Sequence, residues 1–295
     1  MPHHQVLCVG SACWDIVART VHPMAPGYDN PGRIARQLGG VALNIACALA
    51  ARGQSAALLA HVGNDSAGED LLREATALGV DCAHVMRSTT PTDTYLAIED
   101  GSGGLFGAIA DCAGLEAMAS DVLAPLRNGQ LAGKGAPWRG HMVVDGNLPQ
   151  PVLEELASSM ELRFAQVAFV PASPGKATRL RDVVKRFGRT IYVNRIEAEL
   201  ICGYPFKDAT AAAKGLHRLG GGKAVVTDGA TDAVQIDANG LARIEHEGIE
   251  GGSVTGAGDA FLAAHIAAEI AGADAHQALA EASTAASHHI RRSLP

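Results

Sequence analysis

The regular alternation of apolar, strand-like segments with helical segments restricts most strongly how this chain can fold. Residues 5–10 (QVLCVG), 141–147 (HMVVDGN) and 190–194 (TIYVN) carry runs of apolar residues, whereas 67–80 (AGEDLLREATALGV) has the spacing of an amphipathic helix. Near-continuous apolar strands are typical of parallel sheets, because helices cover both faces of such a sheet. We therefore predict an α/β fold with a central, mostly parallel sheet between two layers of helices.

Polar or small residues follow several of the predicted strands. Gly10, Asp145, Asn194 and Thr227 each stand at the carboxyl end of an apolar run. Ligands of open α/β sheets bind beyond these strand ends, so we expect the four positions to share one rim.

Three segments do not fit the alternation. Residues 94–111 (TYLAIEDGSGGLFGAIAD) read as a hairpin with a Gly-rich turn. Together with residues 17–36, they predict a small extra sheet over the site. Residues 112–140 are Gly-rich around RNGQLAGKGAPWRG and predict an irregular surface excursion.

Charge and composition exclude some classes of function. The 295 residues include 24 basic and 31 acidic side chains, a formal net charge of -7, which argues against a protein that coats nucleic acid. No apolar run is long enough to span a membrane, and the amino-terminal residues lack the pattern of a signal peptide. The six cysteines form no Cys-x-x-Cys pair, which favours reduced thiols in a cytoplasmic protein.

The segment Gly256-Ala257-Gly258-Asp259 precedes an Ala-rich helical run and is the first candidate site. Glycines permit a tight turn, and the start of a helix leaves amide donors free to bind an anion. In phosphoryl transfer such donors neutralise the transferred group, while Asp259 accepts the proton of the attacking hydroxyl. The alternative is that Asp259 is an ordinary helix N-cap.

A second candidate lies nearer the amino terminus, where Gly39 and Gly40 precede a helical run that contains Asn44. Close backbone approach at the glycines and an amide that both donates and accepts suit a polyhydroxylated ligand. Asp15, after the first strand, can accept hydrogen bonds from sugar hydroxyls. Alternatively, the glycines form a simple turn, Asn44 is a polar first-turn residue, and Asp15 caps a turn.

Two further candidates stand at strand ends. Asn194 and Glu197, one helical turn apart, suit a hydrated Mg²⁺, although Glu197 also fits as an ordinary first-turn acid. Thr227 and Gly229 could contact phosphate or simply leave the strand. The chain has no Gly-x-x-x-x-Gly-Lys-Ser/Thr loop and no Gly-x-Gly-x-x-Gly fingerprint, so phosphates would depend on helix N-termini and Mg²⁺.

In this order and spacing, the motifs resemble those of the ribokinase-like (PfkB) carbohydrate and nucleoside kinases. The matching segments are GGVALNIA (39–46) with Gly53 and Gly63, Asn-x-x-Glu at 194–197, Thr-x-Gly at 227–229, and SVTGAGDAFLAA (253–264). The resemblance covers essentially the whole chain. Three positions depart from the family pattern: the residues Ser253-Val254-Thr255, His265 in place of an apolar residue, and the missing second glycine after 229.

The resemblance implies one ribokinase-like three-layer α/β/α domain over residues 1–295, with a small β lid from about 17–36 and 94–111. It implies ATP-dependent phosphorylation of a hydroxymethyl group with Mg²⁺ and is compatible with a requirement for a monovalent cation. It also suggests a homodimer paired through the lid. The implied catalytic residues are Asp259 as base and Gly256, Ala257 and Gly258 as anion hole. The implied binding residues are Asp15, Gly39, Gly40 and Asn44 for the substrate, Asn194, Thr227 and Gly229 for the nucleotide, and Glu197 for the metal.

Several segments are similar to the pseudouridine kinase branch of the family, among them 143–149 (VVDGNLP), 169–180 (FVPASPGKATRL) and the hairpin 94–111. They favour pseudouridine, phosphorylated at its 5′-hydroxyl, as the substrate. Trp14 and Tyr95 are the aromatic residues available to stack on a base. The alternatives are a kinase of ribose, fructose or a related ketose, and a sugar- or nucleoside-binding protein on the same fold that has lost catalysis.

Overall fold

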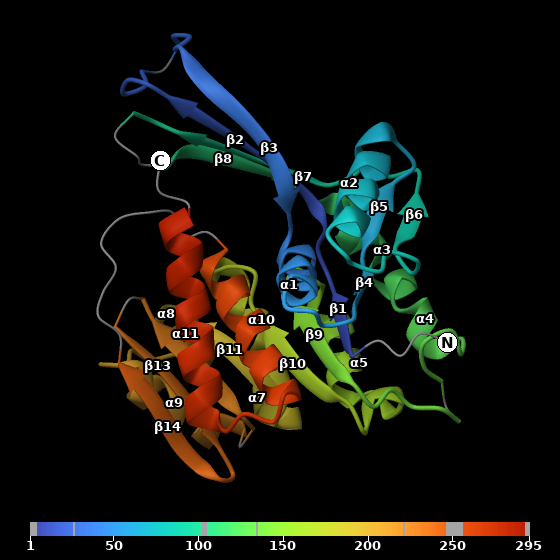
Figure 1. Ribbon diagram of the computed structural model, residues 1–295, viewed down its shortest axis with the longest axis vertical. Coiled ribbons are helices and arrows are strands. Elements are labelled where there is room, and N and C mark those ends of the chain that lie inside the picture. The colour runs from blue at the N-terminus through green and yellow to red at the C-terminus, as the bar shows by residue number, and fades with distance from the viewer. Residues whose placement is uncertain are drawn as a thin grey trace.

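A computed structural model describes residues 5–25, 27–101, 105–133, 135–220, 222–229, 231–245 and 256–292. An eight-stranded sheet forms its centre, and a smaller four-stranded sheet projects from one end (Figure 1). The residues Ser253-Val254-Thr255, where the sequence departs from the family pattern, lie outside the described ranges.

The strands of the central sheet follow the order β14-β13-β12-β11-β10-β9-β1-β4. In chain order they are β1 (Val6–Val9), β4 (Ala56–Leu59), β9 (His141–Asp145), β10 (Gln166–Val170), β11 (Thr190–Asn194), β12 (Ala224–Asp228), β13 (Asp232–Asp237) and β14 (Gly240–Glu245). All neighbours pair in parallel except β13, which is antiparallel to both β12 and β14. The predicted α/β fold with a mostly parallel sheet is therefore confirmed.

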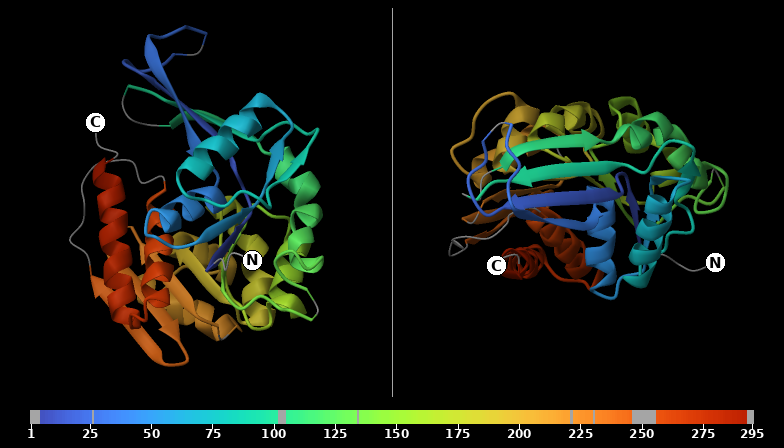
Figure 2. Two further views of the ribbon diagram at one scale, coloured as in Figure 1. Left: turned by 45° about the vertical axis from the view of Figure 1, so that its right-hand side comes forward. Right: turned by 90° about the horizontal axis from the view of Figure 1, so that it is seen from above.

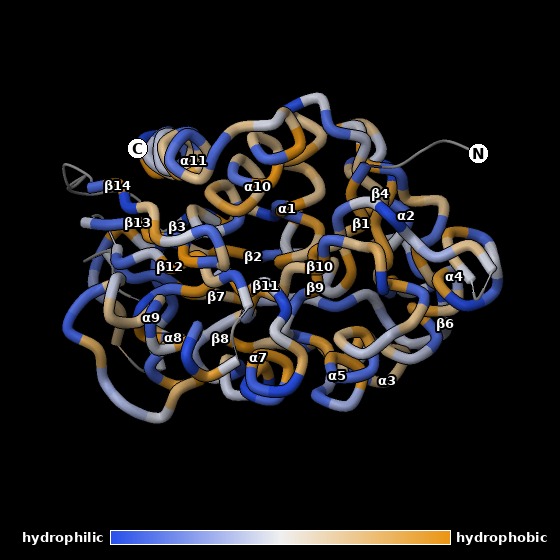
Figure 3. The backbone as a smooth tube through the Cα atoms, turned by 90° about the horizontal axis from the view of Figure 1, so that it is seen from below, coloured by the Kyte–Doolittle hydropathy of each residue, from blue (hydrophilic) through white to orange (hydrophobic). Residues whose placement is uncertain are grey.

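Helices cover both faces of this sheet because alternate residues of each strand point to opposite sides. In β1, Leu7 and Val9 pack on one side and Val6 and Cys8 on the other. The first side carries α3 (Ala113–Val122), α4 (Ala124–Arg127), α5 (Gln150–Ser158), α6 (Pro174–Ala177), α7 (Arg181–Phe187), α8 (Arg195–Cys202) and α9 (Ala209–Gly220). The second carries α1 (Val41–Ala50), α2 (Ser66–Ala77), α10 (Ala257–Ile270) and α11 (Ala275–Arg292). Figure 3 shows the apolar strands between the two helical layers.

The smaller sheet has the order β3-β2-β7-β8, with β2 (Cys13–Thr20), β3 (Gly32–Gly39), β7 (Thr94–Glu99) and β8 (Leu105–Asp111). It contains strands from both segments, 17–36 and 94–111, that break the strand–helix alternation. It projects from the body of the molecule, as the left view of Figure 2 shows. Two short strands, β5 (His61–Gly63) and β6 (Met86–Ser88), pair separately in parallel.

The structure corrects one prediction about local structure. Residues 112–140 are not an irregular excursion throughout: α3 buries Leu115, Ala119 and Val122 against the sheet, and this apolar face stabilises a helix. Residues 174–187 form α6, a 3-10 turn and α7 in place of one continuous helix. Within the described ranges, no helix is both long and apolar enough to cross a membrane.

Candidate active site

A pocket of about 600 Å³ opens at the carboxyl ends of the central strands, beneath the smaller sheet. Its lining includes Asp15, Gly40, Asn44, Asn194, Glu197, Thr227, Gly256, Gly258 and Asp259. The structure thus brings together candidate residues from both ends of the chain. The lining does not include Gly39, Ala257 or Gly229.

The start of α10 forms one side of this pocket. Gly256 is the N-cap of the helix and has φ 80°, a left-handed conformation that glycine adopts readily. Among the described residues no side chain caps this end, and helix geometry leaves the first amide groups without intrahelical partners. This helix start therefore presents donors suited to an anion. Asp259 lies three residues after Gly256, so the alternative that it is the N-cap is wrong.

Asp259 is half-buried at the pocket wall, where its Oδ2 accepts a hydrogen bond of 3.1 Å from Nδ2 of Asn44. Burial raises the pKa of Asp259 to about 7, and the charges of Asp145 and Asp15 act in the same direction. The bond from Asn44 opposes this rise because it stabilises the carboxylate. A carboxyl with a pKa near neutrality is well matched to general-base catalysis.

Backbone geometry explains both glycines before α1. Gly40 has φ 92°, and a Cβ there would lie 2.6 Å from the carbonyl oxygen of Ser11. At Gly39, a Cβ would lie 2.2 Å from the Asp15 carboxylate. Asp15 is not in a turn but on β2, and burial raises its pKa. Gly39 therefore gives Asp15 room at the pocket wall without itself lining the pocket.

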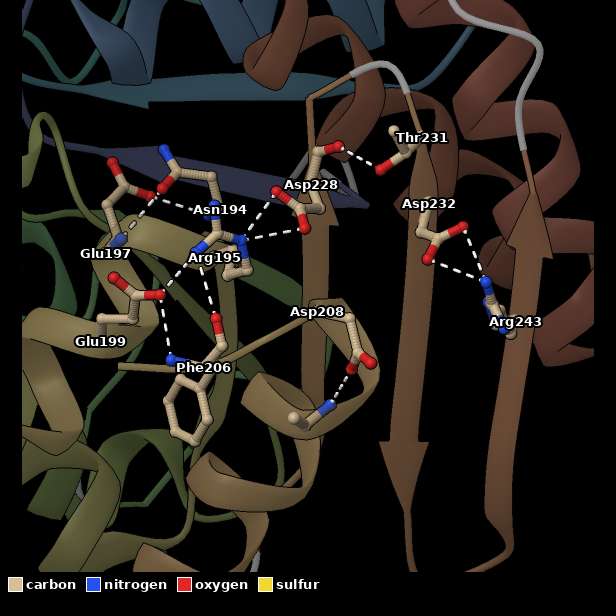
Figure 4. Close-up of polar contacts among 11 residues, drawn as sticks. Asn194, Arg195, Glu197, Glu199, Phe206, Asp208, Asp228, Thr231, Asp232 and Arg243 are labelled. Atoms are coloured by element: carbon tan, nitrogen blue, oxygen red, sulfur yellow. Dashed lines mark hydrogen bonds and ion pairs between the residues drawn. The ribbon is translucent and has the colours of Figure 1, made fainter. Parts of the chain in front are cut away.

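Asn194 and Glu197 form a reciprocal capping box at the start of α8 (Figure 4). Oδ1 of Asn194 accepts from the Glu197 amide at 2.9 Å, and Oε2 of Glu197 accepts from the Asn194 amide at 2.9 Å. Glu197 is therefore a first-turn acid of α8, as the alternative held, and it also lines the pocket. Burial raises its pKa to about 7.

Magnesium binds through one or two carboxylates and retains much of its water, so a single pocket carboxylate such as Glu197 meets the minimal requirement. Among the described residues, no group of three or more His, Cys, Asp or Glu side chains could enclose an ion. The donor set fits a hydrated ion that also contacts a phosphate, and not a metal held by protein ligands alone.

Arg195 joins the ends of β11 and β12, a link that the sequence analysis missed. Its Nε lies 2.9 Å from both carboxylate oxygens of Asp228, and its Nη1 donates to the Phe206 carbonyl at 3.2 Å (Figure 4). The contact fixes the strand end that carries Thr227. Gly229, one residue after Asp228, has φ 56° and is exposed.

The sequence analysis also missed a polar network across the pocket floor. The fully buried Asp145 accepts from the Ser11 amide at 2.9 Å and from the Asn147 amide at 2.8 Å. Nζ of Lys176 donates to Oδ1 of Asn147 at 2.6 Å. The signal for Asp145 was its place at a strand end. Asn147 and Lys176 lie within the segments 143–149 and 169–180 that are similar to the pseudouridine kinase branch, but neither was named as a site residue.

Asp93 is another missed residue, and it lines the pocket although it is only 4% exposed. Its Oδ1 accepts from the Gly114 amide at 3.0 Å, and burial raises its pKa.

Of the two aromatic candidates, Tyr95 lines the pocket. Trp14 is buried, donates from Nε1 to the Ala67 carbonyl at 2.8 Å and is outside the pocket lining, so it is not placed to stack on a base there.

Comparison with known proteins gives consistent results. The family model described as pfkB family carbohydrate kinase matches residues 3–294. The chain is 30% identical over 269 residues to a pseudouridine kinase of Escherichia coli strain K12, an alignment covering 88% of this chain and 81% of that protein.

Solved structures show the same fold. A carbohydrate kinase from Agrobacterium tumefaciens is 26% identical with a TM-score of 0.80, covering 97% of this chain and 90% of the other. A ribokinase of Arabidopsis thaliana, solved with ribose and ATP, has a TM-score of 0.78 at 19% identity, covering 98% and 93%. The central sheet, its helical layers and the smaller sheet are therefore a ribokinase-like arrangement.

Proposed function

The chain belongs to the pfkB family of carbohydrate kinases, and on this premise we propose that it transfers the γ-phosphoryl group of ATP to the 5′-hydroxyl of pseudouridine. Membership of a kinase family makes the chain an enzyme and argues against a binding protein without catalysis. The observation that carries the proposed chemistry is Asp259, held by Asn44 beside the free amide groups at the start of α10.

On the acceptor side, Asp259 takes the proton of the 5′-hydroxyl as its oxygen attacks the γ-phosphorus. The bond from that phosphorus to the bridging oxygen breaks, and ADP leaves. The amides of Gly256, Ala257 and Gly258 face the negative charge on the transferred group. Because these donors are fixed before the substrate binds, they need no reorganisation during the reaction.

On the nucleotide side, Glu197 and Asn194 would hold Mg²⁺ through its water shell, and the ion would neutralise phosphate charge. Thr227 lines the pocket and would contact a phosphate, while the exposed Gly229 would contact the nucleotide outside the pocket lining. Arg195 keeps this strand end in place through Asp228.

The acceptor end of the pocket suits a nucleoside. A volume of about 600 Å³ is within the usual range for small-molecule sites. Asp15 and Asn44 supply acceptors and a donor for ribose hydroxyls, Gly40 lets the backbone come close, and Tyr95 offers a ring to the base. The similarity to the Escherichia coli enzyme favours pseudouridine over a free sugar.

We further propose that two copies pair through the smaller sheet. Its outer face carries Ile34, which is 77% exposed, and Ile109, which is 66% exposed. Leu96 is opposite Ile109 on the neighbouring strand, and Ile34 is in register with Ala18 and Ile98. An exposed apolar sheet face of this kind marks an interaction surface.

The cysteines, all in described parts of the chain, are free thiols, consistent with a cytoplasmic location where ATP is available.

The test is an ADP-release assay over a panel of nucleosides, pseudouridine and uridine included, and free sugars such as ribose and fructose. We expect pseudouridine to give the highest kcat/KM. NMR of the product should show the phosphate at the 5′ position. Asp259→Asn keeps the shape of the side chain and removes the base, and should lower kcat by about 10²–10⁴-fold. Near-normal turnover in this variant would contradict the role of Asp259, and preference for ribose or fructose would identify a sugar kinase.

A further inference from the structure

A histidine is buried where the family pattern has an apolar residue. His265 lies on α10, six residues after Asp259, and its side chain is fully buried. Its Nδ1 is 2.9 Å from the hydroxyl of Tyr192 on β11, and the two rings meet edge to face at 5.4 Å. Burial lowers the pKa of His265 to about 3, so the ring is neutral at physiological pH.

One ring nitrogen of this histidine does not contribute to stability. Among the described residues, its Nε2 has no hydrogen-bond partner. A buried polar atom without a partner destabilises the folded state, and an apolar side chain at this position would avoid that penalty. The hydrogen bond to Tyr192, at 2.9 Å, is an interaction that an apolar residue could not provide. Nδ1 also lies 3.8 Å from Oε2 of Glu269, but the ring is neutral, so this longer contact is not an ion pair.

The position of the bond connects it to the pocket. Phe261, His265 and Glu269 are spaced four residues apart and so share one face of α10. Phe261 stacks on His265 at 6.2 Å, and both Phe261 and Tyr192 line the pocket. Glu269 is in turn ion-paired with Lys223, just before β12. Polar contacts thus join this face of the helix to neighbouring parts of the central sheet.

The two elements joined by the bond both carry candidate site residues. Asp259 and the free amide groups stand at the start of α10, and Asn194 stands two residues after Tyr192 on β11. Residues two apart in a strand point to the same side, so Tyr192 and Asn194 share a face. A displacement of about 1 Å between reacting groups can cost a hundredfold in rate, so the placement of α10 against β11 matters for transfer.

We propose that Tyr192 and His265 are positioning residues, whose hydrogen bond sets the placement of the α10 start relative to the end of β11. This inference rests on the proposed kinase reaction. It assigns His265 a role in the rate of phosphoryl transfer, and none in contacting either substrate.

Three variants of the full chain test the proposal. Tyr192→Phe leaves Nδ1 of His265 buried without this bond and should lower Tm by about 2–8 °C. His265→Leu leaves the Tyr192 hydroxyl unpaired but also removes the unpartnered Nε2, so it should lower Tm by less. The double variant removes both polar groups and should recover the Tm of the unmodified protein. Its kcat should remain lower by about tenfold, with KM for pseudouridine within about twofold. Tyr204→Phe, at an exposed tyrosine, is the matched control and should change neither value.

A second measurement does not depend on turnover. Hydrogen exchange of the peptide that begins α10 should be faster in the double variant than in the unmodified protein and in Tyr204→Phe. Recovery of both Tm and kcat in the double variant, or unchanged exchange at the start of α10, would show that the pair only fills space and would overturn the proposal. If the unmodified protein phosphorylates no acceptor, the proposed function fails, and the exchange result still decides the positioning role.

Discussion

The raised pKa of Asp259 predicts a pH dependence that an ordinary aspartate would not give. The base must be ionised to accept the proton of the acceptor hydroxyl. With a pKa of about 7, the ionised fraction is about 9% at pH 6 and about 91% at pH 8, so kcat/KM for the acceptor should rise about tenfold between these values. A carboxyl at the ordinary value of 3.8 would be almost fully ionised throughout and would give a flat profile.

The hydrogen bond from Asn44 allows the rise of kcat/KM between pH 6 and 8 to be assigned to Asp259. Glu197 also has a pKa raised to about 7, so the midpoint alone does not identify the group. Asn44→Ala removes the 3.1 Å donor from Asp259. A hydrogen bond to a charged group contributes about 1.5 kcal/mol, so the midpoint should move up by about one pH unit.

The assay is initial-rate ADP release from pH 5.5 to 8.5, at low acceptor concentration and with Mg²⁺ in excess, so that the nucleotide keeps one charge state. Loss of acceptor affinity in Asn44→Ala lowers the whole curve but does not move its midpoint. A profile that stays flat between pH 6 and 8, or a midpoint that does not move in Asn44→Ala, would refute the assignment.

Three further predictions concern stability, backbone geometry and assembly. Burial raises the pKa of Asp259 from 3.8 to about 7, so its contribution to stability is fully present below about pH 4 and is lost as pH rises through 7. Asp259→Asn should therefore stabilise the protein at pH 8 by up to about 4 kcal/mol and by little at pH 4, as read from denaturant unfolding at both values. Gly40→Ala places a Cβ 2.6 Å from a backbone oxygen at φ 92°, whereas Gly129→Ala meets a similar φ of 90° with nothing described within 4 Å. We expect the first to lower Tm further than the second and also to raise the acceptor KM, and equal effects would contradict the role of close approach. Ile34→Asp should convert a dimer to a monomer in analytical ultracentrifugation, while Met160→Asp, at another exposed site on the body, should not. A dimer that persists in Ile34→Asp would exclude this face as the interface.

Local patterns in the sequence were sufficient for the fold and for much of the pocket lining. Apolar runs identify buried strands because the two helical layers exclude water from both faces of the sheet. Parallel strands all end at the same edge, so Asn194 and Thr227 could be expected near each other before any coordinates were known. Glycine before a helix likewise indicates backbone that a side chain would obstruct, as at Gly40.

Local patterns could not reveal interactions between distant segments. Asn44 and Asp259 are 215 positions apart, and only the packing of α1 beside α10 puts their side chains 3.1 Å from each other. The same holds for Ser11 and Asp145, whose contact crosses from β1 to β9. The pKa of Asp259 depends on this burial and these neighbours, so spacing in the sequence gives its identity but not its proton affinity.

The sequence by itself thus determined a mostly parallel α/β fold and a set of small and polar residues at its strand ends and helix starts. The tertiary structure decided which of these share a pocket, and it placed Gly39 behind Asp15 and Gly229 outside the lining. It also showed that His265, a polar residue that the sequence left unexplained, is the hydrogen-bond partner of Tyr192. The physical reason is that periodicity reports the surroundings of one element, whereas contacts, burial and proton affinity depend on elements that the folded chain brings together.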